Sequence, residues 1–425
     1  MAQRPDVIII GAGLAGLSAA RTLQAHGVPS LLFEASATIG GRIATDVVEG
    51  FQIDRGFQVL LDSYPEARRT LDLTALDLHA FAPGAVLHRG GGRFGRVGDP
   101  LRTPLDGFRS LTAGAFSVGD ALRVLGLQVA SRRVVAEPMP STPAGTSSTT
   151  TLEALRSRGF SARAIEAFFR PFFGGVFLDR DLHAAQPWFE WLFGMFATGR
   201  ATLPARGMQA IPAQLAAALP SGHLRRERPV RRLLAHAVEL DSGEVIEAET
   251  IIVATDGAAA GRLLPDLTAP SWSGCITLSY AAPEAPITTP HLALKAPDDP
   301  GPVNHVCVPS VVAPSYAPRG RHLVSATLIG HRAEDDAGLD QAVRTQLGDW
   351  FGAAAVGRWQ LLRVSRVPFS LPRTLLGESA ATAAVRRARG VYACGDHLET
   401  PSINGAMRSG RRAAEAVLAD RGARR

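Results

Sequence analysis

The sequence is almost without lysine and has few cysteines. Lys295 is the only lysine among 45 basic residues, and the three cysteines are Cys275, Cys307 and Cys394. The cysteines lie far apart and form no Cys-x-x-Cys pair, which argues against a disulfide framework and against a zinc site and is typical of a reducing compartment. We therefore predict no metal site.

The chain also lacks a concentrated basic segment, although its net charge is +6. The arginines are scattered in short clusters such as Arg231–Arg232, and no zinc finger, RNP motif or basic helix is present. Because nucleic-acid-binding proteins usually carry such a patch or motif, we expect no nucleic acid partner.

No apolar run is long enough to cross a bilayer. The stretch from Val7 to Leu23 is largely apolar, but three glycines interrupt it and it has no convincing cleavage site, so we do not interpret it as a signal peptide. We expect a cytoplasmic protein, soluble or at most peripheral on the inner face of the membrane. The length of 425 residues predicts about two to three domains' worth of structure.

A dinucleotide-binding pattern opens the chain. Residues Asp6–Ile10 have the continuous apolar pattern of a buried parallel strand, and a Gly-x-Gly-x-x-Gly turn, a helix from Leu17 to His26 and a second strand over Ser30–Phe33 follow. The glycines allow a tight turn, a close approach to a pyrophosphate and close helix packing, while free N–H groups at the helix start hold phosphates. An acid ending the second strand would accept both hydroxyls of a ribose. The predicted ligands are Gly11, Gly13, Leu14, Ala15, Gly16 and Glu34.

Two further segments decide which dinucleotide is bound. Glu34 is followed by Gly40-Gly41-Arg42 and then by Gly50-Phe-Gln-Ile-Asp54-Arg-Gly56-Phe57, which together resemble the extended FAD fingerprint of the flavin-containing amine oxidase and phytoene desaturase superfamily. The resemblance implies that Gly40, Gly41 and Arg42 wrap the FAD diphosphate. It also implies that the strand after the Asp-x-Gly turn, with Gly56 and Phe57, runs beside the flavin.

The C-terminal part of the chain carries a matching pattern. A short apolar strand ends in Gly395-Asp396, and a loop from Thr400 then enters an Ala-rich helix, which resembles the C-terminal motif of the same superfamily. There the aspartate bonds the ribitol of FAD and the helix N-terminus points at the pyrimidine end of the flavin, where a helix dipole favours negative charge. A Pro229-Val230 segment resembles the part that contacts adenine. The FAD ligands implied are Val230, Gly395, Asp396, Ser402, Ile403, Asn404 and Ala406.

The cofactor motifs lie at both ends and in the middle of the chain, so the FAD-binding domain is expected to be discontinuous. We predict an α/β fold with a Rossmann-type FAD-binding domain, like that of glutathione reductase, over residues 1–82, 221–270 and 384–425. Residues 83–220 and 271–383 are expected to form an inserted α+β substrate domain. Capping boxes at Ser117–Asp120 and Thr150–Glu153 predict helices there.

Several apolar segments of the substrate domain have two interpretations. The helix expected over Ala121–Arg133 is interpreted as core-facing, and the alternative is an interfacial helix that admits a lipophilic substrate from a membrane. A group of aromatic residues is interpreted as core rather than as pocket lining: Phe168, Phe169, Phe172, Phe173, Trp188, Phe189 and Trp191.

Two departures from the amine oxidases of the superfamily guide the choice of branch. Those enzymes hold water near flavin N5 with a lysine and surround the amine with aromatic rings. Here Ser402 stands at a ring position, and Lys295 lies about twenty residues beyond the position expected for the lysine. The sequence is therefore closer to the carotenoid desaturase and isomerase-like branch, which also resembles protoporphyrinogen oxidase. No cysteine falls in the usual tethering region, so we expect non-covalent FAD.

The resemblance implies dehydrogenation of a hydrophobic, isoprenoid or carotenoid-type substrate by hydride transfer to flavin N5, with oxygen or a quinone as electron acceptor. Phe57, Gln58 and Arg206 are candidates to face the flavin, and Arg206 replaces a glycine of the family's Pro-x-Gly-Gly-Met loop. No catalytic acid or base can be named. The alternatives are an amine oxidase that produces hydrogen peroxide, a redox-neutral FAD-dependent polyene isomerase and a non-catalytic lipid-group carrier, although a carrier has no need of the intact cofactor motifs.

Overall fold

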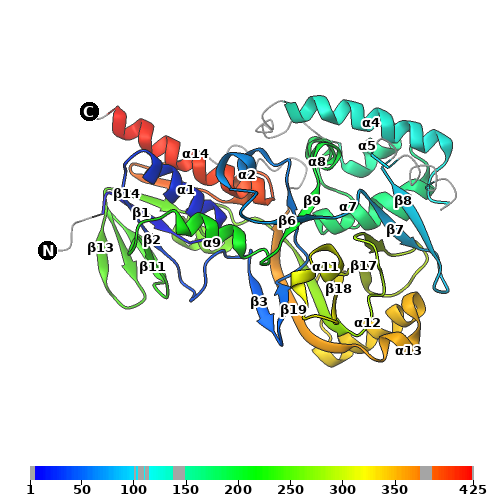
Figure 1. The fold of residues 1–425 in the computed structure, drawn as a ribbon. Helices are drawn as coiled ribbons and strands as arrows, with labels where there is room; N and C mark the ends of the chain where they lie inside the picture. Colours follow the sequence, from blue (N-terminus) through cyan, green and yellow to red (C-terminus); the bar gives the residue numbers. More distant parts are fainter. Residues whose placement is uncertain are drawn as a thin grey trace.

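The structure is a computed structural model and describes residues 5–99, 102–103, 110, 114–136, 149–373 and 385–423. The described chain forms two lobes, one built on a mainly parallel sheet and the other on a mainly antiparallel sheet (Figure 1). None of the described helices is long and apolar enough to cross a membrane.

The first lobe is built on a six-stranded sheet of order β10-β2-β1-β14-β21-β20. Its strands are β1 (Val7–Ile10), β2 (Ser30–Phe33), β10 (Leu224–Arg225), β14 (Thr250–Val253), β20 (Arg386–Ala388) and β21 (Val391–Ala393). All neighbours are parallel except β20, which pairs antiparallel with β21. The strands thus come from the three segments that the sequence assigned to an FAD-binding domain.

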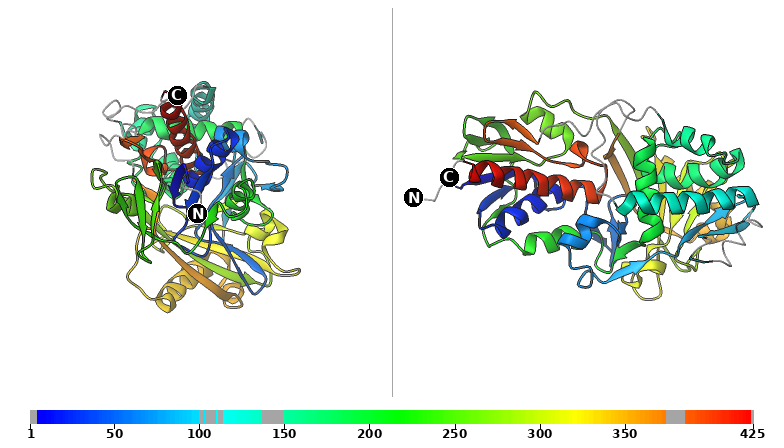
Figure 2. Two further views of the ribbon diagram at one scale, coloured as in Figure 1. Left: turned by 90° about the vertical axis from the view of Figure 1, so that its left-hand side faces the viewer. Right: turned by 90° about the horizontal axis from the view of Figure 1, so that it is seen from above.

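Two helices pack together on this sheet. They are α1 (Leu14–Ala25) and α14 (Ile403–Gly422), which run side by side in Figures 1 and 2. A Cβ atom built on Gly410 would lie 2.0 Å from the carbonyl oxygen of Ala15, so only glycine allows this approach. The first helix begins three residues before the predicted start, because Gly13 is its N-cap.

Smaller elements complete the first lobe. A three-stranded meander contains β11 (Val230–Leu234), β12 (Ala237–Leu240) and β13 (Val245–Glu247). The helices are α2 (Pro65–Thr70), α9 (Ala210–Ala217) and α10 (Gly257–Leu263), and the 3-10 turn η3 (Asp396–Leu398) leads to α14.

The second lobe is built on a seven-stranded sheet of order β19-β15-β18-β17-β16-β7-β8. Its strands are β7 (Gly84–His88), β8 (Phe94–Gly98), β15 (Trp272–Ala282), β16 (Leu292–Leu294), β17 (Val303–Cys307), β18 (His322–Ile329) and β19 (Gln360–Pro372). Only β16 and β7 pair in parallel. Along β15 the side chains alternate between the two faces, so Ile276, Leu278 and Tyr280 pack in a core with α12 (Asp336–Phe351) and its neighbour α13 (Ala353–Val356).

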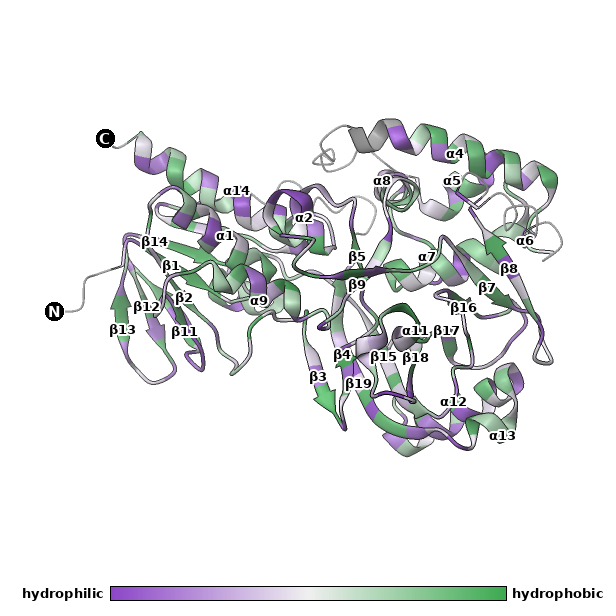
Figure 3. Ribbon diagram, viewed as in Figure 1, coloured by the Kyte–Doolittle hydropathy of each residue, from purple (hydrophilic) through white to green (hydrophobic). Residues whose placement is uncertain are grey.

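A layer of helices covers another side of this lobe (Figure 1). It contains α4 (Val118–Ala136), α5 (Thr151–Ser157), α6 (Ala162–Ala164), the π-helical turn η1 (Ile165–Phe169), α7 (Arg170–Phe177) and α8 (Gln186–Thr198). The predicted capping box at Thr150 is confirmed, since its hydroxyl accepts from Glu153 N–H while the Glu153 carboxylate accepts from Thr150. Hydrophilic and hydrophobic residues alternate along α4 (Figure 3).

Short elements connect the two lobes. The hairpin of β3 (Thr45–Val48) and β4 (Phe51–Asp54) follows the first cofactor motif, and a small sheet joins β5 (Leu60–Leu61), β9 (Ala201–Pro204) and β6 (Leu78–Ala80). The turns α11 (Pro309–Val312) and η2 (Pro314–Tyr316) lie beside β18 and β4. The predicted fold class, a Rossmann-type α/β unit with a second α+β unit, is what the chain forms. The exact domain boundaries stay a prediction.

Candidate functional site

The larger cavity of the site, of about 820 Å³, extends between the two lobes. We call it the cofactor cavity, because most of the predicted cofactor residues line it. They are Gly11, Gly13, Leu14, Ala15, Glu34, Gly40, Gly41, Arg42, Gly56, Phe57, Gln58, Val230, Gly395, Asp396, Ser402, Ile403 and Ala406. The second lobe adds walls from the face of its sheet, which include Cys275, His305 and Thr327.

The glycine turn after β1 provides a close backbone approach. Gly11 has φ 104°, and a Cβ there would lie 2.8 Å from the carbonyl oxygen of Ala254, so a larger residue would not fit. By contrast, a Cβ on Gly13 would meet no atom within 4 Å, because this backbone faces the cavity. The turn therefore presents the N-terminus of α1 to the cavity, which suits a phosphate group.

Glu34 is fixed at the end of β2 by three hydrogen bonds. Its Oε2 accepts from the Ala12 N–H at 2.8 Å, and its Oε1 accepts from the Ser36 N–H at 2.9 Å and from the Ser36 hydroxyl at 2.8 Å. Each carboxylate oxygen can accept more than one hydrogen bond, so the group keeps acceptor capacity toward the cavity that it lines.

Arg42 and Asp396 form a bidentate ion pair in the cavity wall. Arg42 Nη1 donates to Asp396 Oδ2 at 2.8 Å, and Arg42 Nη2 donates to Asp396 Oδ1 at 2.5 Å. Burial alone would lower the pKa of Arg42, but the Asp396 carboxylate outweighs it and the pKa lies above its usual value. The pair thus joins the two predicted cofactor motifs, which are 354 residues apart in sequence.

The structure corrects three predicted site residues. Gly16 does not line the cavity, but it has the helix-packing role that its motif predicts, since a Cβ there would lie 1.9 Å from the carbonyl oxygen of Gly11. Asn404 points away, and its Oδ1 accepts from the Glu66 N–H at 3.0 Å, which ties α14 to α2. Arg206 is exposed and lines neither cavity of the site; it stands in a turn in which the Gly207 N–H donates to the carbonyl oxygen of Pro204 at 3.0 Å.

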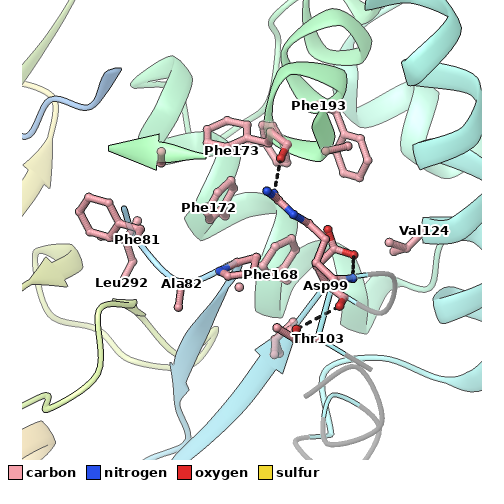
Figure 4. Close-up of a pocket in the computed structure, with 18 of the residues that line it drawn as sticks. Phe81, Ala82, Asp99, Thr103, Val124, Phe168, Phe172, Phe173, Phe193 and Leu292 are labelled. Carbon is pink, nitrogen blue, oxygen red and sulfur yellow. Dashed lines mark hydrogen bonds between the residues drawn. The ribbon is translucent and has the colours of Figure 1, made fainter. Parts of the chain in front are cut away.

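A second cavity, of about 520 Å³, continues from the first, and we call it the apolar cavity. The two share six lining residues: Phe57, Val59, Phe172, Val176, Phe196 and Leu292. In Figure 4, Phe81 and Leu292 lie at one end, and Val124, Asp99 and Thr103 lie toward the other. Its polar lining residues, Asp99, Arg102, Thr103, Ser110, Gln128 and Arg200, come from the segments around β8, α4 and α8.

The prediction that the aromatic group forms core is confirmed for five of its residues, which belong to the buried core cluster, and several rings of the group also line a cavity: the five are Phe169, Phe173, Trp188, Phe189 and Trp191. Phe168, Phe169, Phe172 and Phe173 line the apolar cavity, and Trp188 lines the cofactor cavity. Phe189 and Trp191 line neither cavity. These rings come from η1, α7 and α8, where residues three or four apart share one helix face, so one face walls the cavity while the other packs in the core.

The wall of the cofactor cavity carries a thiol and no lysine. Lys295 lines neither cavity, and its Nζ donates to the carbonyl oxygen of Gly301. Twenty residues earlier, Cys275 lines the cofactor cavity with its Sγ 3.2 Å from Ser370 Oγ. Burial raises the pKa of this thiol, so it stays protonated near neutral pH. The cavity wall therefore contains no lysine.

His305, which lies on β17, was not predicted as a site residue. Its ring meets Phe57 edge-on with centroids 5.0 Å apart, and its Nδ1 lies 3.1 Å from Asn304 Nδ2. Burial lowers the pKa of His305 to about 4, so the ring is neutral at physiological pH. A single histidine in a strand has no sequence signature, and only the pairing with Thr327 on β18 brings it to the cavity.

Comparisons with known proteins agree with this site. A family model described as flavin containing amine oxidoreductase matches residues 14–418. Polyamine oxidase 2 of Arabidopsis thaliana is 48% identical over 54 residues, which are 13% of this chain and 11% of that protein. The matches span at most 35% of the length of the first curated relatives.

Solved structures resemble the whole chain at low identity. A putative protoporphyrinogen oxidase from Exiguobacterium sp. 255-15 has a TM-score of 0.74 at 19% identity and covers 99% of this chain and 100% of its own. A wild-type putrescine oxidase bound to putrescine has a TM-score of 0.73 at 17% identity and covers 98% of this chain and 99% of its own. At these identities the likeness shows the fold alone.

Proposed function

Because the chain belongs to the flavin-containing amine oxidoreductase family and is an FAD-dependent oxidoreductase, we propose that it dehydrogenates an apolar substrate of isoprenoid or carotenoid type. Bound FAD would supply the acceptor for a hydride, and oxygen or a quinone would take up the electrons afterwards. The chain's own contribution is to bind the substrate, align its C–H bond and exclude water.

The residues of the cofactor cavity fit FAD. The open backbone at Gly13 and the start of α1 suit the diphosphate, and Glu34 suits the adenosine ribose. Gln58 supplies an independent sign of a ligand: its Nε2 donates to the carbonyl oxygens of Arg42 and Arg55, while its buried Oε1 has no partner among the described residues. We propose Asp396 for the ribitol and non-covalent attachment.

The apolar cavity is the observation that carries the proposed substrate class. Its six residues shared with the cofactor cavity bear no titratable group, so the place where a substrate would meet the flavin is apolar. Such a junction binds a hydrocarbon segment through contact with aromatic and aliphatic walls and desolvates it. An ammonium group would lose hydration there, and none of the six shared residues carries a carboxylate to compensate it.

The outer face of α4 supports delivery of such a substrate from a membrane. Val124 of this helix lines the apolar cavity, while Val118, Leu122 and Val129 are 64%, 64% and 54% exposed. The core-facing interpretation of the helix therefore describes the face that carries Val124, and the interfacial alternative is our proposal for the exposed face. We propose peripheral contact with anionic lipid, which the exposed Arg123 and Arg132 favour. Sedimentation with anionic vesicles tests it, and a protein that stays in the supernatant contradicts it.

Amine oxidation is the second candidate. Relatives named as amine oxidases and the acid Asp99 in the wall of the apolar cavity favour it, whereas Lys295 outside the cavity and Ser402 at the ring position count against it. A redox-neutral isomerase would use the same cavities. A lipid-group carrier is disfavoured because it would need no site for a dinucleotide.

Anaerobic mixing of the purified flavoprotein with two substrate sets tests the proposal. One set contains amines, and the other contains polyenes and porphyrinogens in liposomes, while the visible flavin band is followed. We expect bleaching by the lipophilic set only. Bleaching by an amine alone contradicts the proposed substrate class and establishes amine oxidation instead. A polyene that is converted without net bleaching indicates the isomerase.

A further inference from the structure

Two polar side chains face the cofactor cavity from neighbouring strands of the seven-stranded sheet. His305 on β17 and Thr327 on β18 are directly opposite in the antiparallel ladder, so both lie on the same face of the sheet. They are 3% and 2% exposed, and both line the cavity. Within the described part of the chain, neither His305 Nε2 nor Thr327 Oγ1 has a hydrogen-bond partner. Buried polar atoms normally have a hydrogen-bond partner, so two such atoms on one cavity wall call for a partner inside the cavity.

The hydrogen bonds around His305 assign its tautomer. Asn304 Nδ2 donates to the carbonyl oxygen of Pro171 at 2.8 Å, which fixes the orientation of the amide. The same Nδ2 lies 3.1 Å from His305 Nδ1, so Nδ1 must accept. In a neutral imidazole the proton is then on Nε2. The cavity wall therefore presents an N–H donor.

The donor lies beside the entrance from the apolar cavity. The ring of His305 packs against Phe57, which lines both cavities. On the Nδ1 side, a Cβ built on Gly175 would lie 3.1 Å from the ring, so α7 covers that edge. The Nε2 edge of the ring is not covered by α7 and forms part of the cavity wall.

This donor distinguishes among apolar substrates. A pure hydrocarbon leaves the buried N–H unsatisfied, and an ammonium group cannot accept from it, whereas a neutral oxygen can. We propose that His305 is a specificity-determining residue whose Nε2–H binds a carbonyl, hydroxyl or ether oxygen on an otherwise apolar substrate. This inference rests on the proposed function and narrows its substrate class to oxygenated isoprenoid-type molecules.

Binding to the holoenzyme tests the inference with a matched pair of probes. The probes are a C20 isoprenoid hydrocarbon and its ketone, delivered in liposomes, and the perturbation of the visible flavin band gives each affinity. We expect the wild type to bind the ketone about tenfold more tightly. His305→Leu, which removes the donor at similar volume, should lose this preference and keep its affinity for the hydrocarbon. His305→Gln, which keeps an N–H donor, should retain most of the preference.

Several outcomes overturn the inference. One is that the wild type binds the two probes with equal affinity, and another is that His305→Leu weakens the binding of both probes equally. A third is that His305→Leu changes the flavin spectrum without any probe, which would assign the donor to the flavin. A ¹⁵N NMR spectrum that places the proton on Nδ1 between pH 6 and 8 also overturns it. If neither probe binds while an amine bleaches the flavin, the proposed function fails and the inference falls with it. Equal binding of both probes leaves the proposed function intact.

Discussion

Asp54 of the second cofactor motif holds three segments of the chain together. Its Oδ1 accepts from the Thr45 hydroxyl and from the Met208 N–H at 3.0 Å, and its Oδ2 accepts from the Tyr316 hydroxyl at 2.9 Å. Burial raises the pKa of this carboxyl to about 6, although the hydrogen bonds act in the opposite direction. The residue thus stabilises the hairpin beside the site without lining the cavity.

The raised pKa of Asp54 predicts a specific pH dependence of stability. The folded protein binds this proton up to about pH 6, whereas the unfolded chain releases it near the usual pKa of 3.8. The contribution to the free energy of unfolding is therefore fully present below pH 3.8 and is lost as the pH rises through 6. Relative to Asp54→Asn, the wild type should lose on the order of 2–3 kcal/mol between pH 4 and pH 7. Urea unfolding at four pH values measures this difference, and parallel curves contradict it.

Glu34 allows a residue-level test of cofactor binding. Glu34→Ala removes the acceptor for the ribose hydroxyls, and a charged hydrogen bond contributes about 1.5–3 kcal/mol, so the FAD dissociation constant should rise about 10- to 100-fold. Ser36→Ala is the matched control, because it removes a hydroxyl that contacts Glu34 Oε1 and the carbonyl oxygen of Thr38 but leaves the Glu34 carboxylate in place. Fluorescence titration of the apoprotein with FAD measures both variants. Unchanged FAD binding by Glu34→Ala would exclude it as a ligand.

Residues with a local role could be predicted from the sequence, whereas residues with a tertiary role could not. Gly11 could be recognised because the tight turn that needs its positive φ is formed by the glycine motif itself, within a few residues of sequence. His305 depends on a contact between Asn304 and Pro171, which are 133 residues apart, and no local pattern encodes that contact. Arg206 was misplaced because the side-chain direction depends on how its loop turns over Thr45.

At the level of elements, the contact between α1 and α14 joins the first motif to the last. The sequence predicted the first helix from the glycine turn before it and Gly27 after it, and the last helix from its Ala-rich composition and its motif. Their mutual packing, however, depends on small residues that face each other. Gly410 is one of these, since its position leaves no room for a methyl group beside Ala15. Both helix N-termini line the cofactor cavity, so this contact also sets the position of the phosphate-binding turn relative to Ser402.

Gly410→Ala should therefore destabilise the protein by about 1–3 kcal/mol, because the added carbon would overlap a backbone atom that cannot rotate away. Gly422→Ala on the same helix is the control: no atom lies within 4 Å of its Cβ position, and alanine favours helix, so no loss is expected. Thermal unfolding of the two variants gives the comparison. A Gly410→Ala protein as stable as the control would show that the helices can separate without cost.

At the scale of the molecule, the site is a junction of two cavities that different parts of the chain build. The cofactor cavity is lined largely by sequence motifs whose residues have a fixed spacing because they bind one ligand. These motifs made the cofactor cavity predictable from the sequence. The apolar cavity is assembled from β7, β8, α4, α7 and α8, and its residues look like ordinary core residues. Whether a phenylalanine fills a core or walls a cavity depends on how these elements are spaced, and residue order does not state that spacing.

A bulky side chain at the junction should separate cofactor binding from substrate oxidation. Val176 lines both cavities at their junction, so Val176→Trp should slow flavin reduction by a lipophilic substrate about 100-fold, because the C–H bond could no longer reach the flavin, while the variant still binds FAD. Val124 lines only the apolar cavity, and Val124→Trp, which shortens it, should reject long substrates and still oxidise short ones. Dithionite reduces the flavin without binding in the apolar cavity, so the rate of reduction by dithionite should be the same in both variants as in the wild type. If Val176→Trp is reduced by the substrate as fast as the wild type, the substrate reaches the flavin by another route and the apolar cavity is not its binding site.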